Sequence, residues 1–276
     1  MANEGLEGKT IVITGGSSGI GAAAARALRA RGANVAITGR SQATTRLAAE
    51  IGAEAYLVDF ARFEEVRGLA GQLLARYPHI DVLANNVGGV IDRRQLTVDG
   101  HEKTLQVNHL AGFLLTMLLR ERLEASSATI INTSSGAHRL GHVDFDDLES
   151  EKRYSPMRVY GTAKMMNILH AAELNRQFRG VRAVSFHPGV VATGFGREGS
   201  WLTRKAYEGI IAKLFMITPD EGADTLVWLA TSTPERDWTP GEYYVKRKRA
   251  STRPEAVSPA VAQRLWDASI RLTGLS

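Results

Sequence analysis

Short apolar runs rich in β-branched residues alternate with longer segments of helical spacing along most of this sequence. The apolar runs predict strands at Thr10–Thr14, Asn34–Thr38, Ala55–Val58, Val82–Ala84, Thr129–Asn132, Arg182–His187 and Glu242–Lys246. The segments between and after them predict helices at Ala22–Arg31, Thr44–Ile51, Glu64–Tyr77, Lys103–Glu124, Val159–Phe178, Thr218–Ala230 and Pro259–Leu272. Strands and helices that alternate in this way form parallel sheets covered on both faces. The sequence therefore predicts an α/β fold, a doubly wound parallel sheet of about seven strands with helices on both faces.

Length and composition narrow the class further. The 276 residues include 34 Lys and Arg against 29 Asp and Glu, a net charge of +5, and 44% are hydrophobic. No linker or internal repeat divides the chain, so a single domain over residues 1–276 is expected. The absence of cysteine excludes disulfides, zinc–thiolate sites, iron–sulfur clusters and a cysteine nucleophile. Because there is no long apolar run and no signal-peptide core before Gly8, we expect a cytoplasmic protein without stable membrane insertion.

Two long segments interrupt the alternation of strands and helices, and a third segment follows the last predicted strand. His138–Arg158 is a polar connection, and Gly189–Met216 carries several aromatic residues. Long loops in compact domains are often functional, so the second segment, at about 189–216, is predicted to be a substrate lid. Core packing of its aromatic side chains is the alternative. Residues 247–276 are predicted to form a C-terminal extension whose helix packs on its own domain, with a subunit contact in a homo-oligomer as the alternative.

A glycine-rich turn joins the first predicted strand to the first predicted helix. Glycines allow a backbone to turn tightly and approach a ligand closely, and the N–H groups that open a helix attract a pyrophosphate. In this strand–turn–helix context the turn predicts a dinucleotide site of the Rossmann type, although ordinary turn chemistry is the alternative. The residues expected to contact the cofactor here are Gly15, Ser17, Ser18, Gly19, Ile20 and Gly21.

The end of the second strand indicates which cofactor binds. Sites selective for NAD place an acidic residue near this position, whereas an arginine accommodates the 2′-phosphate of NADP. Here Gly39 carries no carboxylate, Arg40 supplies a guanidinium, and Ser41 adds a hydroxyl donor. NADP(H) is the predicted cofactor. An ordinary surface role for Arg40, with NAD(H) also accepted, is the alternative.

Two further turns follow the third and fourth strands, at the edge where ligands bind such sheets. Asp59-Phe60 ends the third strand, and the Asp59 carboxylate is placed to accept the adenine amino group. The turn after the fourth strand contributes Asn86, Val87 and Gly88 to the predicted cofactor site, with a purely structural turn as the alternative.

A tyrosine and a lysine four residues apart begin the long helix after the polar connection. Tyr160 and Lys164 project from one helical face, and a lysine cation lowers the pKa of a neighbouring tyrosine toward neutrality. The pair is therefore a candidate acid/base device. Ser135 follows the fifth strand and can donate a hydrogen bond to a carbonyl oxygen. Asn108 interrupts a predicted helix, a position that asparagine disfavours, which indicates either a functional contact or a minor cost on an exposed face.

Together these motifs resemble the short-chain dehydrogenase/reductase family over nearly the whole chain. The family's glycine motif matches Thr14 to Gly21, and its Asn-Asn-Ala-Gly motif is Asn85 to Gly88 here, with Val87 in place of alanine. Its helix asparagine, catalytic serine, tyrosine and lysine match Asn108, Ser135, Tyr160 and Lys164. Its Pro-Gly after the sixth strand matches Pro188 and Gly189, and the resemblance implies that Val191 also contacts the cofactor and that Thr193 contacts the nicotinamide carboxamide.

A closer resemblance points to one branch of that family. Val107–Leu110, Ser134–His138 and Asp147–Ser155 are similar to the retinol dehydrogenase and WW-domain oxidoreductase branch. The 25-residue spacing from Ser135 to Tyr160 is longer than in the wider family. The resemblance implies that Tyr160 exchanges the proton of a carbonyl or alcohol substrate and Ser135 fixes its oxygen. It also implies that Lys164 lowers the tyrosine pKa and binds the nicotinamide ribose, and that Asn108 holds a water.

The chemistry expected is therefore hydride transfer between NADP(H) and a carbonyl or alcohol substrate, with an apolar substrate suggested by the aromatics of the predicted lid. A nucleotide-sensing regulatory protein that lacks turnover is the alternative. No metal site is expected, since His138 and His142 lie in a loop without a fixed ligand set. The basic cluster Lys246–Arg249 is predicted to be a solvated edge rather than a nucleic-acid or membrane site. His109 and His187 are predicted to be packed histidines.

Overall fold

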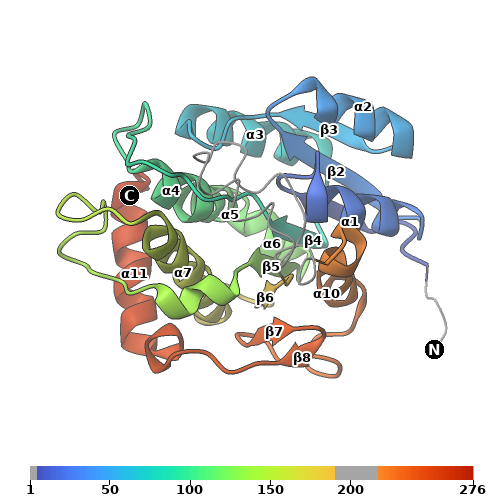
Figure 1. The fold of residues 1–276 in the computed structure, drawn as a ribbon. Coiled ribbons are helices and arrows are strands. Elements are labelled where there is room, and N and C mark those ends of the chain that lie inside the picture. The colour runs from blue at the N-terminus through green and yellow to red at the C-terminus, as the bar shows by residue number, and fades with distance from the viewer. Residues whose placement is uncertain (1–4, 190–216, 276) are drawn as a thin grey trace.

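Eight strands form one sheet at the centre of the molecule (Figure 1). The computed structural model describes residues 5–189 and 217–275. The strand order is β3-β2-β1-β4-β5-β6-β7-β8, and all neighbours are parallel except β7 and β8. The predicted doubly wound sheet is confirmed, with β8 added as a short antiparallel edge strand. The strands are β1 (Thr10–Ile13), β2 (Asn34–Gly39), β3 (Glu54–Leu57), β4 (Val82–Asn85), β5 (Thr129–Thr133), β6 (Arg182–His187), β7 (Tyr243–Val245) and β8 (Lys248–Arg249).

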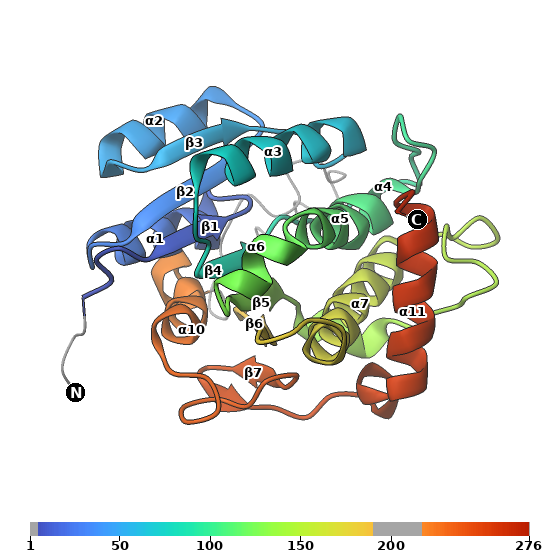
Figure 2. The ribbon, with the colours of Figure 1, turned by 180° about the vertical axis from the view of Figure 1, so that it is seen from behind.

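Helices cover both faces of this sheet and enclose two apolar cores (Figures 1 and 2). One face carries α1 (Gly19–Arg29), α2 (Gln42–Ile51) and α10 (Pro219–Thr231), and the other carries α3 (Phe63–Arg76), α5 (Ala111–Leu118) and α7 (Pro156–Gln177). Alternate residues of a strand point to opposite faces. Ile11 and Ile13 of β1 therefore enter the core under α1, whereas Val12 enters the core under α7. This two-sided burial explains why the strands are apolar throughout.

The helix predicted at Lys103–Glu124 is present but divided. It consists of α4 (Lys103–Leu105), a π-helical turn η1 (Gln106–Leu110), α5 and α6 (Arg120–Ala125), with a bend at Leu119. The fully buried Glu102 begins it by accepting hydrogen bonds from the backbone N–H groups of Thr104 and Leu105. A π-helical turn inside a helix disturbs the regular hydrogen bonding and often marks a functional position. Asn108 lies at its centre.

The C-terminal part of the sheet ends in a tight hairpin. Lys246 and Arg247 both have positive φ angles, 50° and 59°, which suit a two-residue turn between antiparallel strands. The Arg247 guanidinium pairs with Asp224, and that of Arg249 pairs with Glu242 at 2.7 Å. The basic cluster is thus an exposed sheet edge with ion pairs to its own chain. Upstream, Thr218 and Glu221 form the capping box that begins α10.

The last helix packs on the same chain. Figure 2 shows α11 (Pro259–Leu272) beside α7, and its Trp266 ring lies 5.0 Å from that of Phe113 and 6.2 Å from that of Phe178. Packing on its own chain, the default expectation for this segment, is confirmed. Short 3-10 turns, η2 (Gly136–Leu140) and η3 (Pro254–Val257), flank α7. The predicted lid lies outside the described residues apart from Gly189. Within the described ranges, no helix is both long enough and apolar enough to span a bilayer.

Candidate active site

The glycine-rich turn follows β1 and leads directly into α1. Gly15 and Gly19 have φ angles of +67° and +52°, a region that other residues rarely adopt. A side chain at Gly21 would lie 2.3 Å from the Gly15 carbonyl oxygen, so only glycine permits this packing. The turn therefore leaves exposed backbone and the N-terminal end of α1 beside each other, the arrangement that a pyrophosphate requires. Ser17, Ser18 and Ile20 lie within this turn.

Asn86 braces the turn from the end of β4. Its side-chain N–H groups donate to the carbonyl oxygens of Thr14 and Gly15 at 3.1 and 3.4 Å, and its carbonyl oxygen accepts from the Thr133 hydroxyl at 3.2 Å. The Thr14 hydroxyl in turn accepts from the backbone N–H groups of Asn86 and Val87. Asn86 thus joins β1, β4 and β5 at their carboxyl ends, and these contacts engage its amide with protein atoms.

The end of β2 leaves no room for a side chain at position 39. A Cβ on Gly39 would lie 2.3 Å from the Thr44 hydroxyl oxygen and 2.9 Å from that of Ser17. Arg40 and Ser41 come next and are both exposed, with Ser41 at the start of α2. Further along the edge, the Asp59 carboxylate accepts from the backbone N–H of Ala61 at 3.0 Å. The side chain of the neighbouring Phe60 is buried in the core under α3.

The π-helical turn η1 places the Asn108 side chain against the turn that follows β4. Its side-chain oxygen accepts from the Gly89 N–H at 2.9 Å, and its N–H groups donate to the carbonyl oxygens of Gly89 and Thr104 at 3.0 and 2.9 Å. A Cβ on Gly88 would meet the Asn108 side-chain oxygen at 2.4 Å and Lys164 Nζ at 2.6 Å. The structure therefore brings three predicted site residues, Gly88, Asn108 and Lys164, into direct proximity.

The two serines after β5 have different surroundings. The Ser134 hydroxyl is buried and donates to the Lys164 carbonyl oxygen at 2.7 Å, which ties it to α7. Ser135 begins η2, and its hydroxyl oxygen accepts from the Ala137 N–H at 3.2 Å while its side chain is half-buried. Ser135 thus lies at the carboxyl edge of the sheet, directly after β5, where the sequence predicts the substrate-binding serine.

Tyr160 and Lys164 face each other on one side of α7. Lys164 Nζ lies 5.5 Å from the centre of the Tyr160 ring and donates to the Thr133 carbonyl oxygen at 3.3 Å. Both side chains are buried, Lys164 with only 2% of its surface exposed. Burial disfavours the ammonium form and lowers the pKa of Lys164 from 10.5 to about 7. A lysine that titrates near neutrality beside a tyrosine can supply or withdraw positive charge during a reaction at physiological pH.

A pair of glycines holds the serine turn against α7. A Cβ on Gly161 would lie 2.3 Å from the Ala137 carbonyl oxygen, and one on Gly141 would lie 2.5 Å from the Gly161 backbone. This close approach fixes the start of α7, and with it Tyr160, against the turn that carries Ser135. The sequence analysis missed this role of Gly141 and Gly161. Their positions beside His142 and Tyr160 give no periodic signal, since the contact is between segments distant in sequence.

The sixth strand ends at His187 and is followed by Pro188 and Gly189. Gly189 has a φ of +99°, and its N–H donates to His187 Nδ1 at 3.3 Å. Burial lowers the pKa of His187 to about 4, so the ring is neutral at physiological pH, and the predicted packed role of this histidine is consistent with its surroundings. Val191 and Thr193, the two expected cofactor contacts beyond this turn, lie outside the described residues.

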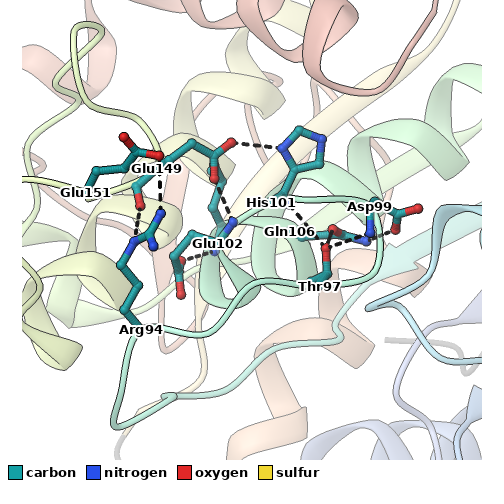
Figure 3. A network of polar contacts seen from close by, with 9 residues as sticks. Arg94, Thr97, Asp99, His101, Glu102, Gln106, Glu149 and Glu151 are labelled. Atoms are coloured by element: carbon teal, nitrogen blue, oxygen red, sulfur yellow. Dashed lines mark hydrogen bonds and ion pairs between the residues drawn. The ribbon is translucent and has the colours of Figure 1, made fainter.

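A polar network joins the segment before α4 to the connection before α7 (Figure 3). His101 Nδ1 lies 2.8 Å from the Glu149 carboxylate, whose second oxygen accepts from the Glu102 N–H at 2.6 Å. The Arg94 guanidinium donates to the Glu149 backbone carbonyl at 3.1 Å. The hydrogen bond with Glu149 raises the pKa of His101. This network anchors the long connection predicted at His138–Arg158 next to the helix that carries Asn108.

The histidines considered as metal ligands have other partners. His138 Nδ1 lies 2.7 Å from the Ser135 carbonyl oxygen, and His142 Nδ1 lies 3.0 Å from the Glu255 carboxylate. Among the described residues, no group of three or more His, Cys, Asp or Glu side chains is placed to hold a metal ion.

Comparison with known proteins agrees with this geometry. The short chain dehydrogenase family profile matches residues 9–200. A protein named as a daunorubicin C-13 ketoreductase, from Streptomyces sp. (strain C5), is 43% identical, with 98% of this chain and 94% of that protein covered. Retinol dehydrogenase 14 of Homo sapiens is 36% identical over 98% of this chain and 88% of its own length.

Solved structures with the same fold are also found. A crystal structure of an uncharacterised protein from Mycobacterium paratuberculosis has a TM-score of 0.79 at 29% identity and covers 98% of this chain and 95% of that one. A structure described as an NAD(P)-dependent gluconate 5-dehydrogenase from Beutenbergia cavernae, with NADP bound at low occupancy, has a TM-score of 0.67 at 26% identity. It covers 83% of this chain and 92% of that one.

The fold and the site define a Rossmann-type, nucleotide-binding oxidoreductase of carbonyl and alcohol substrates. The chain belongs to the short chain dehydrogenase family, and its curated relatives place it in the retinol dehydrogenase-like branch. The resemblance stated from the sequence is confirmed at both levels.

Proposed function

We propose that this protein is an NADP(H)-dependent reductase of apolar carbonyl compounds, which also oxidises the corresponding alcohols. The observation that carries the proposal is the buried Lys164 ammonium beside the Tyr160 ring, at the sheet edge that also holds the Ser135 hydroxyl. The nicotinamide cofactor supplies or accepts the hydride when it is bound. A protein that only senses the nucleotide has no need of this arrangement.

Each of the four residues has a chemical role in the proposal. The Tyr160 hydroxyl gives its proton to the carbonyl oxygen during reduction and removes the alcohol proton during oxidation. The Ser135 hydroxyl donates a hydrogen bond to that oxygen and so fixes its position. The Lys164 ammonium stabilises the phenolate left on Tyr160 and is placed to hold the nicotinamide ribose. Asn108 holds the turn at Gly88 and Gly89, which passes beside the lysine, and is the expected site of a water.

The glycine-rich turn fits a dinucleotide, because its backbone packs too closely for side chains. The bare backbone of such a turn can approach the phosphates of the cofactor. A preference for NADP(H) is supported by the end of β2. An acidic residue at position 39 is excluded by the contacts of Gly39 with Thr44 and Ser17, whereas Arg40 and Ser41 are exposed where a 2′-phosphate would lie. The NADP in the gluconate 5-dehydrogenase structure is consistent with this preference. NAD(H) is the second candidate.

The names of the relatives support an apolar substrate. One is named for a daunorubicin ketone and several for retinol, both large hydrophobic compounds. We further propose that residues 1–276 act as one domain in the cytoplasm, with the lid at about 189–216 over the substrate. The C-terminal extension at about 247–276 would complete that domain.

The central test is the Tyr160→Phe variant. We expect it to lose turnover of NADPH with a panel of apolar ketones and aldehydes, while NADPH binding measured by fluorescence is unchanged. Tyr56→Phe is the matched control, because the Tyr56 hydroxyl donates to the Glu54 carboxylate at 3.1 Å on β3, the outermost strand at the opposite end of the sheet order from β7 and β8. Wild-type turnover in Tyr160→Phe, or no turnover of any carbonyl by the wild type, would contradict the proposed function.

The cofactor preference is tested with Arg40→Ala. We expect the KM for NADPH to rise about 10- to 100-fold, since a charge-assisted contact to phosphate is worth roughly 1.5–3 kcal/mol, and the KM for NADH to stay unchanged. Arg46→Ala, on the exposed side of α2, is the control. Equal effects of Arg40→Ala on both cofactors would refute the phosphate role.

A further inference from the structure

A buried hydrogen-bond network continues behind the catalytic lysine. The Thr133 carbonyl oxygen, which accepts from Lys164 Nζ at 3.3 Å, also accepts from the side-chain N–H of Asn167 at 3.0 Å. The same amide donates to the backbone carbonyl of Asn108, again at 3.0 Å. Asn167 stands one helical turn after Lys164 on α7 and is only 6% exposed. One amide therefore holds two backbone carbonyls that flank the lysine.

These two contacts fix which way the Asn167 amide points. Because both contacts are to carbonyl oxygens, the nitrogen must face them, and its side-chain oxygen faces the other way. That oxygen lies 3.2 Å from His109 Nδ1, in the π-helical turn beside Asn108. His109 Nδ1 must therefore carry a hydrogen and donate it to Asn167.

The second nitrogen of His109 reaches the C-terminal helix. His109 Nε2 lies 3.0 Å from the hydroxyl oxygen of Ser269 on α11. Complete burial lowers the pKa of His109 to about 4, so the ring is neutral and Nε2 is an acceptor when Nδ1 carries the hydrogen. The Ser269 hydroxyl can satisfy Nε2 by turning its hydrogen away from the Leu265 carbonyl at 2.8 Å. Ser269 thus gives the buried Nε2 of that tautomer a hydrogen-bond partner.

We propose that Ser269, His109 and Asn167 are positioning residues for the lysine–tyrosine pair, so that the C-terminal helix takes part in catalysis. The inference rests on the proposed function and extends it to α11, which lies beyond the residues matched by the family profile. Without the Ser269 hydroxyl, the buried Nε2 of His109 loses its hydrogen-bond partner, so the ring is held less firmly against the Asn167 oxygen. The Asn167 amide is then held less firmly too, and its hydrogen bonds to the carbonyls of Thr133 and Asn108 weaken.

Loss of these donors shifts the pKa of Lys164 in one direction, upward. The network borders a small pocket of about 10 Å³, lined by Asn108, His109 and Asn167 among other residues and close in size to the room that a single water needs. An Asn167 side chain that is shortened or held less firmly lets water approach the Lys164 ammonium and relaxes the carbonyl that it contacts. Hydration favours the charged form, so the pKa of Lys164 rises. A residue that only stabilises the fold would leave this pKa unchanged.

The test compares Ser269→Ala and Asn167→Ala with Thr273→Val. Thr273 is the matched control, because it is similarly buried at the C-cap of α11 and its hydroxyl donates to carbonyls of that helix, Ser269 and Ile270. The readouts are kcat and its pH profile, the KM for NADPH, and the urea midpoint of unfolding. Ser269→Ala is the mild variant, which loses one hydroxyl and tests the idea even where Asn167→Ala folds poorly.

We expect kcat to fall about 10- to 100-fold in Asn167→Ala, as small displacements of catalytic groups do, and by a smaller factor in Ser269→Ala. In both variants the pH of half-maximal kcat moves upward while the KM for NADPH stays unchanged. Thr273→Val keeps the wild-type kcat and pH profile. If Ser269→Ala and Asn167→Ala change only the unfolding midpoint, the inference is wrong, whereas turnover by Tyr160→Phe would overturn the proposed function itself.

Discussion

Replacing Lys164 by methionine tests the physical basis of the site most directly. The lysine is 2% exposed, and its pKa is lowered from 10.5 to about 7 because burial disfavours its charge. Each pKa unit corresponds to about 1.4 kcal/mol, so holding the ammonium in this place costs about 5 kcal/mol of folding stability at low pH. Methionine fills a similar volume without a charge. The Lys164→Met variant should therefore be more stable than the wild type in acid and inactive as an enzyme.

The pH dependence gives the sharper readout. Between pH 7 and pH 10.5 the unfolded lysine holds its proton while the folded lysine has lost it, so the unfolded state binds more protons. The contribution of Lys164 to the unfolding free energy of the wild type must therefore increase as the pH rises from 7 to 10.5. Relative to Lys164→Met, we expect the wild type to gain about 2 to 3 kcal/mol between pH 6 and pH 9.

The assay is urea unfolding of the cofactor-free protein, followed by fluorescence at several pH values. Taking the difference between wild type and Lys164→Met cancels the other titrating groups. Lys152→Met is the control, because Lys152 is exposed in the connection before α7 and its replacement should leave the pH dependence unchanged. If the difference in unfolding free energy between wild type and Lys164→Met is the same at pH 6 and pH 9, the reasoning that burial lowers the pKa of Lys164 is refuted.

Two further outcomes follow from the geometry. Gly161→Ala places a Cβ 2.3 Å from the Ala137 backbone oxygen, so thermal unfolding should show a loss of about 1–3 kcal/mol and kcat should fall, whereas Gly68→Ala, which meets no neighbour within 4 Å, should do neither. Glu149→Gln should destabilise the protein by about 1 kcal/mol near pH 5.5–6.5, as chemical unfolding at several pH values would show. The hydrogen bond with Glu149 raises the pKa of His101, so its stabilisation is full below the ordinary histidine value and is lost as the pH rises through the folded value. Burial acts to raise the pKa of Glu149, but the hydrogen bonds from His101 and from the Glu102 N–H lower it overall. The folding stability that the Glu149 carboxylate contributes is therefore lost as the pH falls through this lowered pKa. An effect of Glu149→Gln that is equally large at pH 9 would contradict this assignment.

The fold was largely predictable because its signals are local. Two-sided burial makes each parallel strand apolar, and amphipathic periodicity marks the helices, so β6 and α11 have the predicted bounds and α10 begins one residue after its predicted start. The division of the helix at Lys103–Glu124 was less visible. Only Asn108 hinted at it, since a poor helix former in an apolar helix is a local conflict.

The candidate catalytic residues were also found in the sequence, because Ser135 follows a strand at the carboxyl edge, Tyr160 and Lys164 share a helical face, and Asn108 is a poor helix former within a predicted helix. The supporting residues were not. Gly161 and Gly141 are neighbours only because η2 packs on α7, and Asn167, His109 and Ser269 come from three segments. The spacing of Tyr160, Lys164 and Asn167 on one face of α7 was the one available signal for Asn167.

The sequence by itself therefore determined the sheet, the glycine-rich turn and the identity of the candidate catalytic residues, since these depend on local periodicity and on chemistry at strand ends. The tertiary structure alone decided how those residues behave. It buries Lys164 so that its pKa falls to about 7, and it ties Ser134 to α7 while Ser135 remains at the sheet edge. It also brings the Ser269 hydroxyl within hydrogen-bond distance of His109 Nε2. Burial and hydrogen-bond partners are properties of segments brought together by folding, and no single segment of the sequence encodes them.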